Sequence, residues 1–207
     1  MKISASFLSS ENIPKDLVKL NETDVDYIHV DVMDGKFVPG KTMPFKEMKN
    51  IYKFTDKRLD VHLMVQDPGK YIPLYAELNT EYITFHIEVE NVSTYLELIK
   101  SYGIKAGLAI KPYTPIKSLV PYLPLIDMVL VMGVEPGKGG QEFILDTESK
   151  ILELKDLIQA YHSDVIINVD GGINDQTKEY CKKCDILTAG SYIIKSDNFQ
   201  EMINRLR

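Results

Sequence analysis

The sequence predicts an α/β fold in which eight parallel strands close into a barrel surrounded by helices. Short apolar runs typical of strands alternate with longer amphipathic segments, and this alternation repeats eight times. No linker, low-complexity segment or charge block interrupts the series, so residues 1–207 are expected to form a single domain. Strands joined through helices pair in parallel with right-handed crossovers. Eight such units in about 200 residues fit a small (β/α)8, or TIM, barrel.

An open doubly wound sheet is the alternative architecture. Such a sheet usually has fewer strands and carries its glycine-rich turn after the first one. Here the first strand-like run ends in Ser6-Phe7-Leu8, without glycine. The sequence therefore favours the closed barrel.

The expected elements follow one another in a regular order. Strands are expected at the short apolar runs, which are residues 3–8, 27–32, 59–64, 82–86, 106–110, 128–132, 165–169 and 186–189. Helices are expected at the segments between and after them, which are residues 14–20, 45–52, 68–77, 92–102, 115–122, 147–161, 176–182 and 199–206. Pro14 stands at a first-turn position, where proline is tolerated. Gly103 ends the helix at 92–102, and the helix at 147–161 is the longest.

The composition excludes several classes of protein. Hydrophobic residues make up 44% and charged residues 26% of the chain, as in globular proteins. The net charge of -6 argues against a nucleic-acid partner, and two cysteines do not make a disulfide scaffold. No apolar run reaches the roughly 18 residues of a membrane span, and Met1 leads directly into a strand pattern rather than a signal peptide. We expect a cytoplasmic protein that binds neither nucleic acid nor membrane.

Polar residues stand at the ends of three expected strands. His29, Asp31 and Met33 alternate along one strand and share a face, because a strand points every second side chain to the same side. The next strand repeats the pattern with His62 and Met64, and the seventh ends in Val169-Asp170-Gly171-Gly172. In a barrel the C-terminal strand ends meet at one mouth, where active sites lie.

Two imidazoles and two carboxylates at this mouth predict a site for one divalent transition metal. The predicted ligands are His29, Asp31, His62 and Asp170. Imidazole favours zinc, iron or cobalt over magnesium, and manganese is a further option; zinc is our first choice. The alternative is that these four are unrelated polar residues near loops.

Glycine loops follow the last three strands. They are Gly137-Lys138-Gly139-Gly140, Gly171-Gly172 and Gly190-Ser191. Glycine lets backbone N–H groups approach an anion closely, and the late loops of such barrels are a frequent phosphate site. The spacing of a nucleotide P-loop is absent. The three loops together predict a phosphate cradle.

At this point the sequence resembles the ribulose-phosphate 3-epimerase family. The matching segments span the chain in order, and they are Ser6-Phe7-Leu8, His29-Val30-Asp31-Val32-Met33-Asp34-Gly35, Phe37-Val38-Pro39, Asp60-Val61-His62-Leu63-Met64, Val134-Glu135-Pro136-Gly137, Gly139-Gly140-Gln141 and Val169-Asp170-Gly171-Gly172. The resemblance implies a TIM barrel of the ribulose-phosphate-binding type. It implies an isomerase of the pentose phosphate pathway that converts D-ribulose 5-phosphate to D-xylulose 5-phosphate by inverting C3.

The resemblance also assigns roles to individual residues. It implies that Asp31 and Asp170 hold the metal together with His29 and His62, and that these two aspartates are also the acid/base pair. The residues that it implies for substrate binding are Ser6, the three methionines Met33, Met64 and Met132, the closing loop with Gly137, Gly139 and Gly140, and the phosphate-binding Gly171, Gly172, Gly190 and Ser191.

The chemistry fits those residue types. Inverting a carbon next to a ketone removes a proton from one face and delivers another to the opposite face, through an anionic enediolate. One base cannot reach both faces of a bound sugar, so two carboxylates are required. A bound cation stabilises the enediolate.

Five positions depart from the family pattern. Lys36, Gly40, Gly133, Lys138 and Asn168 stand where the family usually has His, Asn, Ser or Thr, Phe, and Glu. None of them removes a predicted ligand, but the two lysines at the rim could favour a different or more anionic sugar phosphate. Allulose-6-phosphate 3-epimerase is therefore a neighbouring family to keep open.

Other interpretations of the sequence are kept beside this one. A barrel that binds a sugar phosphate without chemistry is one, and a decarboxylase or aldol-type lyase using Lys111 is another. His86 ends the fourth strand and is expected to support a ligand or to pack rather than to ligate. Cys181 and Cys184 have the spacing of a redox or zinc site, but without a second pair they are expected to be buried thiols. The sequence leaves a homo-oligomer open.

Overall fold

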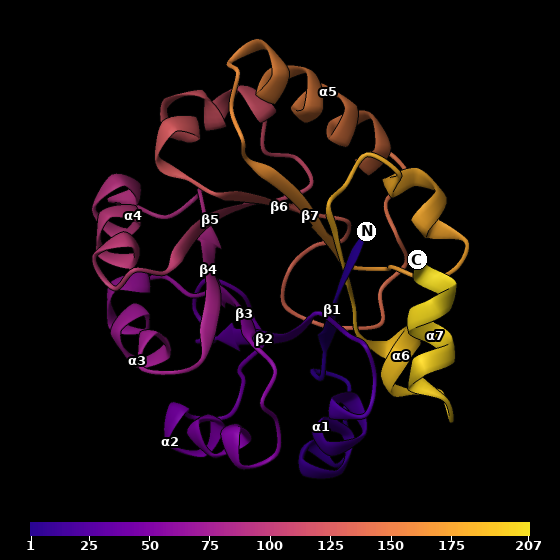
Figure 1. Ribbon diagram of the computed structural model, residues 1–207. Coiled ribbons are helices and arrows are strands. Elements are labelled where there is room, and N and C mark those ends of the chain that lie inside the picture. The colour runs from indigo at the N-terminus through magenta and orange to yellow at the C-terminus, as the bar shows by residue number, and fades with distance from the viewer.

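Eight parallel strands form a closed barrel in the chain order β1 to β8 in the computed structural model, which describes residues 1–207 except the side chain of Tyr52. The strands are β1 Lys2–Ser6, β2 Tyr27–Met33, β3 Leu59–Met64, β4 Thr80–His86, β5 Lys105–Ile110, β6 Met128–Met132, β7 Ile166–Asp170 and β8 Ile186–Ala189. Figure 1 looks along the barrel and shows the helices as an outer ring. The predicted (β/α)8 architecture is confirmed.

The outer ring combines α-helices with 3-10 segments. The α-helices are α1 Ile13–Asn21, α2 Phe45–Met48, α3 Ile72–Ala76, α4 Val92–Ser101, α5 Thr147–Ala160, α6 Ser191–Ile194 and α7 Phe199–Leu206. The 3-10 segments are η1 Lys49–Lys53, η2 Pro68–Lys70, η3 Ile116–Leu125 and η4 Thr177–Cys181. Asn12 caps α1 by accepting a hydrogen bond from the backbone N–H of Lys15, at 3.2 Å.

Several predicted helices are shorter or tighter than expected. The helix expected at 115–122 is the 3-10 segment η3, which contains Pro121 and Pro124. Proline has no N–H to donate and its ring crowds the preceding turn, so an α-helix is disfavoured there. The expected helix at 176–182 is likewise 3-10, and the sequence did not predict α6.

The hydrophobic core lies mainly between the strands and the helices. In β2, for example, Ile28, Val30 and Val32 point outward into this layer and are almost completely buried. The intervening residues point into the barrel, so one strand serves the core with one face and the site with the other. Full burial of each such aliphatic side chain contributes about 1.5–3 kcal/mol.

The barrel interior becomes more polar toward one end. At the N-terminal end of the strands Tyr27, Tyr82, Met128 and Ile186 form a separate apolar cluster. Above it lies a layer of buried polar side chains, joined by hydrogen bonds, that consists of Ser4, His29, Asp60, Asn168 and Thr188. The apolar cluster therefore closes one end of the barrel, and the polar layer lies between this cluster and the mouth at the other end.

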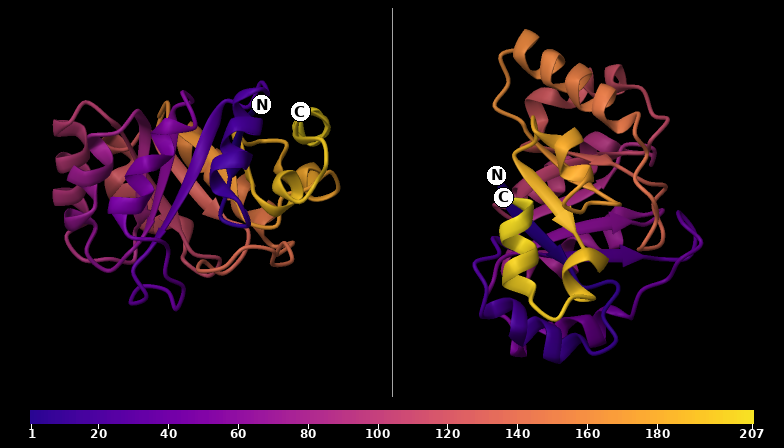
Figure 2. Two further views of the ribbon diagram at one scale, coloured as in Figure 1. Left: turned by 90° about the horizontal axis from the view of Figure 1, so that it is seen from below. Right: turned by 90° about the vertical axis from the view of Figure 1, so that its right-hand side faces the viewer.

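The loops that follow β2 and β6 project from the same end of the barrel, whereas both chain termini lie at the opposite end (Figure 2). The two loops contact each other. A Cβ built on Gly40 would lie 2.3 Å from the carbonyl oxygen of Gly137. We call residues 137–140 the lid loop.

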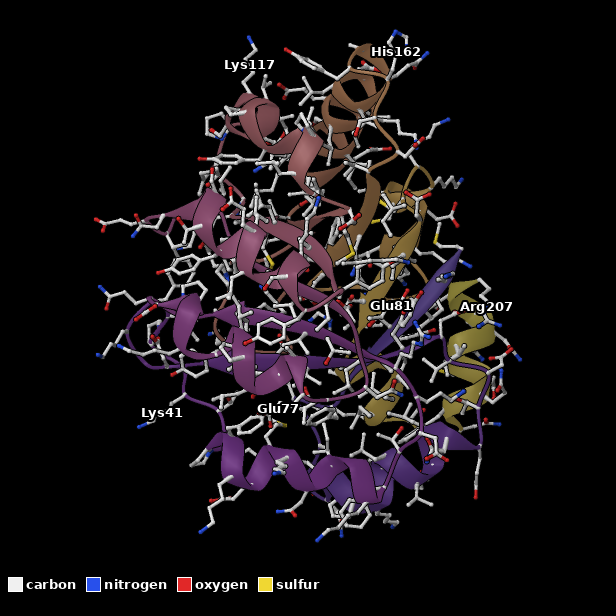
Figure 3. The ribbon with its side chains drawn as sticks, turned by 60° about the vertical axis from the view of Figure 1, so that its left-hand side comes forward. Lys41, Glu77, Glu81, Lys117, His162 and Arg207 are labelled. Carbon is white, nitrogen blue, oxygen red and sulfur yellow. The ribbon has the colours of Figure 1, made fainter. Side chains whose placement is uncertain are left out.

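Charged side chains lie mainly at the outside of the molecule. Figure 3 shows Lys41, Lys117 and Arg207 at the periphery. Arg207 pairs with Asp26 at 3.1 Å. Within the described part of the chain, no helix is both long and apolar enough to cross a bilayer.

Candidate functional site

Four side chains converge at the mouth of the barrel. His29 and Asp31 come from β2, His62 from β3 and Asp170 from the last position of β7. The parallel register places Asp31 directly beside His62. Each of the four offers one ligand atom, and these atoms all lie within 4.8 Å of one another. The four residues that the sequence singled out as metal ligands are thus brought together.

The two carboxylates face the two imidazoles in a nearly symmetric arrangement. Asp31 Oδ1 lies 3.4 Å from both His29 Nε2 and His62 Nδ1. Asp170 Oδ2 lies 3.7 Å and 3.6 Å from the same two nitrogens. The imidazoles are fully buried, while the side chains of Asp31 and Asp170 are 6% and 16% exposed.

The two imidazole nitrogens that face the carboxylates show whether the four residues suit a metal ion. Among the described residues, His29 Nε2 and His62 Nδ1 are buried without a hydrogen-bond partner. An unsatisfied buried polar atom costs about 1–3 kcal/mol, so such atoms normally have a ligand. Both point at carboxylate oxygens, and two nitrogens with two oxygens suit a divalent transition metal. The residues therefore fit the ion.

A buried carboxylate orients the first imidazole. Asp60 Oδ2 lies 2.9 Å from His29 Nδ1, and it also accepts hydrogen bonds from Ser4 Oγ at 2.9 Å and Asn168 Nδ2 at 3.3 Å. Because the carboxylate accepts the Nδ1 proton, Nε2 is the ring nitrogen of His29 that faces the cluster and is left to bind a metal. Thr188 Oγ1 in turn donates to Asn168 Oδ1 at 3.0 Å.

A different set of groups contacts the second imidazole. His62 Nε2 lies 2.9 Å from His86 Nε2, and His86 Nδ1 lies 3.2 Å from Glu88 Oε2. His86 is fully buried.

The charges at the site favour a cation between the imidazoles and carboxylates. Burial opposes charge on His29, but the carboxylates of Asp60 and Asp31 outweigh it and hold the pKa of the imidazole well above its usual value. Burial acts to raise the pKa of Asp31, yet His29 and His62 together hold it far below the usual range. Asp31 is therefore an ionised carboxylate at neutral pH.

Of the two outer groups, the pKa of His86 is shifted in the opposite direction to that of His29, whereas the pKa of Glu88 is lowered like that of Asp31. Burial, with the neighbouring His62, lowers the pKa of His86 to about 4 despite the attraction of Glu88. Burial alone would raise the pKa of Glu88, but hydrogen bonds from His86, Thr114 and the Lys111 N–H lower it to about 2. A neutral imidazole thus lies against an ionised carboxylate.

A cavity opens directly above the cluster. Asp31 and Asp170 form part of its floor. The substrate-binding candidates that line it are Ser6, Met64, Met132, Gly137, Gly139, Gly140, Gly171, Gly172, Gly190 and Ser191. Met33 does not line this cavity. It lines a neighbouring groove and packs against Val38 and Met64.

The loops that follow β7 and β8 close one side of the cavity. Gly171 and Gly172 have φ angles of 107° and 70°, which other residues rarely adopt. A Cβ on Gly172 would also lie 2.7 Å from the backbone of Phe143, so the loop requires glycine on two grounds. Gly190 directly precedes the short helix α6. Loops after strands seven and eight with a short extra helix are the usual phosphate site of this fold.

The five departures from the family pattern fall in different places. Lys138 borders the cavity, whereas Lys36 lines the neighbouring groove. Gly40 makes room for the lid loop, and Gly133 lies against the ring of Phe143. Asn168 belongs to the buried network of Asp60.

Other residues considered from the sequence lie outside the site. The ammonium of Lys111 lies over the ring of Phe37, 4.2 Å from its centroid, and Lys111 does not line the cavity within the described chain. Cys181 and Cys184 are free and buried; the contact with Cys181 and burial raise the pKa of the Cys184 thiol. His162 follows α5 at the periphery (Figure 3).

The sequence interpretation assigned no role to Asp60, Ser4 or Glu88. A signal was present in each case, because each stands two residues from a site residue, namely His62, Ser6 and His86. The period of two places Ser4 with Ser6 and Asp60 with His62 on one face of a strand, whereas Glu88 lies in the turn after β4. The partner on the next strand depends on the register, which the sequence does not give.

Comparisons with known proteins point to one family. A family model described as the ribulose-phosphate 3 epimerase family matches residues 2–194. A ribulose-phosphate 3-epimerase of Methanocaldococcus jannaschii is 39% identical over 212 aligned positions, which cover 100% of this chain and 90% of the relative. That of Mycobacterium tuberculosis (strain ATCC 25618 / H37Rv) is 38% identical over 185, covering 88% and 81%.

Solved structures agree in fold. The crystal structure of a 3-hexulose-6-phosphate synthase superposes with a TM-score of 0.72 and covers 100% of this chain and 98% of that one. The structure of KGPDC from Streptococcus mutans has a TM-score of 0.69, with 99% and 94% covered. The sequence identities are 13% and 12%, so these likenesses show the shared barrel alone.

Proposed function

The chain belongs to the ribulose-phosphate 3-epimerase family, and we propose that it interconverts D-ribulose 5-phosphate and D-xylulose 5-phosphate by inverting C3. The observation that carries the proposal is the convergence of Asp31 and Asp170, from β2 and β7, on one pair of imidazoles beneath a cavity. Inversion at a carbon next to a ketone requires two acid/base groups, and these two carboxylates border the cavity.

Asp31 and Asp170 exchange roles between the two directions of the reaction. One carboxylate removes the C3 proton from one face of the sugar, and the other delivers a proton to the opposite face. Ser6 Oγ donates to Asp31 Oδ2 at 2.8 Å, which fixes the orientation of that carboxylate. Its low pKa keeps Asp31 in the ionised form, which is the form that a base must have.

The residues that would hold one divalent ion are His29, His62, Asp31 and Asp170. Zinc is our first choice because it accepts mixed nitrogen and oxygen ligands in four-coordinate sites, and iron, manganese or cobalt are the other options. When bound, the ion supplies positive charge that stabilises the anionic enediolate and reduces repulsion between the carboxylates.

Substrate is bound by the two sides of the cavity. We assign the phosphate to the glycine loops at Gly171, Gly172 and Gly190, with Ser191, because their backbone lies open to the cavity. Met64 and Met132 line the same cavity and provide an apolar wall that excludes water from the reacting carbons. The lid loop covers the bound sugar.

The experiment that tests this function is isotope exchange during turnover. Zinc-loaded protein is incubated with D-ribulose 5-phosphate in deuterated water, and the product is examined by NMR. We expect D-xylulose 5-phosphate that carries deuterium at C3. Product without deuterium would contradict the exchange of protons through two carboxylates. Turnover of D-allulose 6-phosphate in place of the pentose would redirect the assignment to the neighbouring epimerase family.

A further inference from the structure

His62 has a second ring nitrogen that faces away from the carboxylates, and its surroundings carry a further assignment. We infer that Glu88 and His86 form a hydrogen-bond relay that fixes the proton of His62 on Nε2 and leaves Nδ1 free to bind the metal. The inference rests on the metal centre of the proposed function. It adds two positioning residues to that centre, neither of which touches the ion.

Glu88 determines the direction of the hydrogen bonds in the relay. Its Oε1 atom accepts hydrogen bonds from the backbone N–H of Lys111, at 2.9 Å, and from the hydroxyl of Thr114. Its Oε2 atom lies 3.2 Å from His86 Nδ1. An ionised carboxylate only accepts, so His86 must carry its proton on Nδ1.

That proton position determines the next one. A neutral imidazole with its proton on Nδ1 presents a lone pair at Nε2, and His86 Nε2 lies 2.9 Å from His62 Nε2. His62 must then donate from Nε2, so the lone pair of its Nδ1 faces Asp31 and Asp170, at 3.4 Å and 3.6 Å. This is the form of histidine that binds a metal.

The opposite direction brings one repulsive contact, between His86 and Glu88, and it blocks the metal position at His62. With its proton on Nε2, His86 would turn the lone pair of Nδ1 toward the carboxylate of Glu88. His62 would then carry its proton on Nδ1, where it would occupy the position of the metal. The carboxylate of Glu88 selects the first arrangement.

Packing holds the relay in place. The ring of His86 lies against Phe37, with centroids 4.8 Å apart, and the ammonium of Lys111 lies over the Phe37 ring. Lys150 Nζ donates to the carbonyl oxygens of Lys111 and Pro112, at 2.6 Å and 2.8 Å, and so fixes the loop that reaches Glu88. His29 instead has its proton fixed in one step by Asp60, and it offers the other ring nitrogen.

The variant Glu88→Gln tests the relay. Both oxygens of Glu88 accept hydrogen bonds. The backbone N–H of Lys111 can only donate, so the glutamine amide keeps its oxygen there and places its NH2 group against His86. The NH2 group then donates to His86 Nδ1, which moves the proton of His86 to Nε2 and reverses the relay. We expect zinc affinity to fall about 10- to 100-fold, as for other groups that orient metal-bound histidines. The affinity is measured with zinc alone, in competition with a chromophoric chelator.

A spectroscopic readout separates the relay from a merely structural role. The ¹⁵N shifts of the ring nitrogens in the zinc-loaded protein report which nitrogen carries each proton. We expect His62 protonated at Nε2 and His86 at Nδ1 in the unchanged chain, and a different pattern for His86 in Glu88→Gln. Thr114→Val is the matched control, because it removes a donor to Oε1 and leaves the His86 side intact; its zinc affinity should not change.

A second pair of variants decides the matter if Glu88→Gln does not fold. His86→Gln keeps an oxygen that can accept from His62 Nε2, whereas His86→Leu does not. We expect the first to bind zinc more tightly than the second.

The measurements distinguish a failure of the relay from a failure of the proposed metal centre. If the unchanged chain binds one zinc and Glu88→Gln binds it as tightly with the same proton positions, the relay is wrong and the metal centre stands. If His86→Gln and His86→Leu bind equally, the relay is wrong as well. If the unchanged chain binds no zinc or other divalent transition metal, the proposed metal centre itself is wrong.

Discussion

The Nδ1 atom of His29 lies 2.9 Å from Oδ2 of Asp60, and both side chains are fully buried. The contact follows from the register, because His29 and Asp60 are direct neighbours on β2 and β3. A buried carboxylate therefore makes this imidazole a stronger ligand while it fixes the ring. A carboxylate that is not a predicted ligand thus lies one layer below the predicted ligands.

The first prediction tests the charge of Asp60. Asp60→Asn keeps an oxygen for the donors Ser4, His29 and Asn168, but it removes the negative charge. We expect zinc affinity to fall about 10- to 100-fold while the fold is retained. Chelator competition measures the affinity. Ser4→Ala is the control, since it removes one donor and no charge. Equal zinc affinities for Asp60→Asn and the unchanged chain would show that the charge is not needed.

The second prediction concerns the two acid/base candidates. Asp31→Asn and Asp170→Asn should each lower kcat by at least about 10²- to 10⁴-fold, because a positioned acid or base contributes that factor. Steady-state epimerisation with ribulose 5-phosphate measures the loss, with zinc content determined for each variant. Asp164→Asn is the control. It changes an exposed carboxylate at the other end of the barrel and should leave kcat unchanged. Near-normal turnover in either site variant would remove that aspartate from the mechanism.

Much of the site could be predicted because it depends on patterns within single strands. The alternation in His29-Val30-Asp31 places both polar groups on one face, and a closed barrel brings the C-terminal ends of β2, β3 and β7 together. The buried support could not be predicted, because pairs such as His29 with Asp60 depend on the register between strands. Proline set a second limit, since the helical pattern at 115–122 folds as the 3-10 segment η3.

One expected substrate contact, Met33, lies outside the cavity for a reason of geometry. Met33 is in the correct strand and on the correct face, and its neighbour in the register is Met64. Met64 lines the cavity, but Met33 is the last residue of β2 and packs with Val38 in the loop that follows. The fold of that loop, which the sequence left undefined, determines which methionine reaches the cavity.

The third prediction concerns zinc and stability. A ligand that binds only the folded state at 100 times its Kd adds about 2.7 kcal/mol to the free energy of unfolding. For a chain of this size that corresponds to a rise in Tm of roughly 5–10 °C. Thermal unfolding with zinc and with chelator measures the difference. His62→Ala is the control and should lose the shift. An unchanged Tm in the unmodified chain would contradict a zinc site formed by folding.

The fourth prediction tests the contact between Gly40 and the lid loop. A Cβ at Gly40 would lie 2.3 Å from the Gly137 oxygen and 2.7 Å from Met33 Sδ, so Gly40→Ala must displace the lid. Overpacking costs about 1–3 kcal/mol, and we expect kcat/KM to fall on the order of 10-fold. Lys41→Ala, which shortens an exposed side chain in the same loop, is the control. Unchanged kinetics in Gly40→Ala would show that the lid does not need this contact.

The last prediction concerns the charge that Lys138 adds to the lid loop. This lysine is exposed and borders the cavity on the side of the glycine loops. An exposed ion pair contributes little, so Lys138→Met should raise KM for the sugar phosphate roughly two- to fivefold at low salt and leave kcat unchanged. The effect should shrink as salt is added, because salt screens exposed charges. Lys36→Met is the control, since Lys36 lines the neighbouring groove. A KM that does not change, or a change that salt does not affect, would mean that the ammonium of Lys138 stays in solvent and makes no contact with the phosphate.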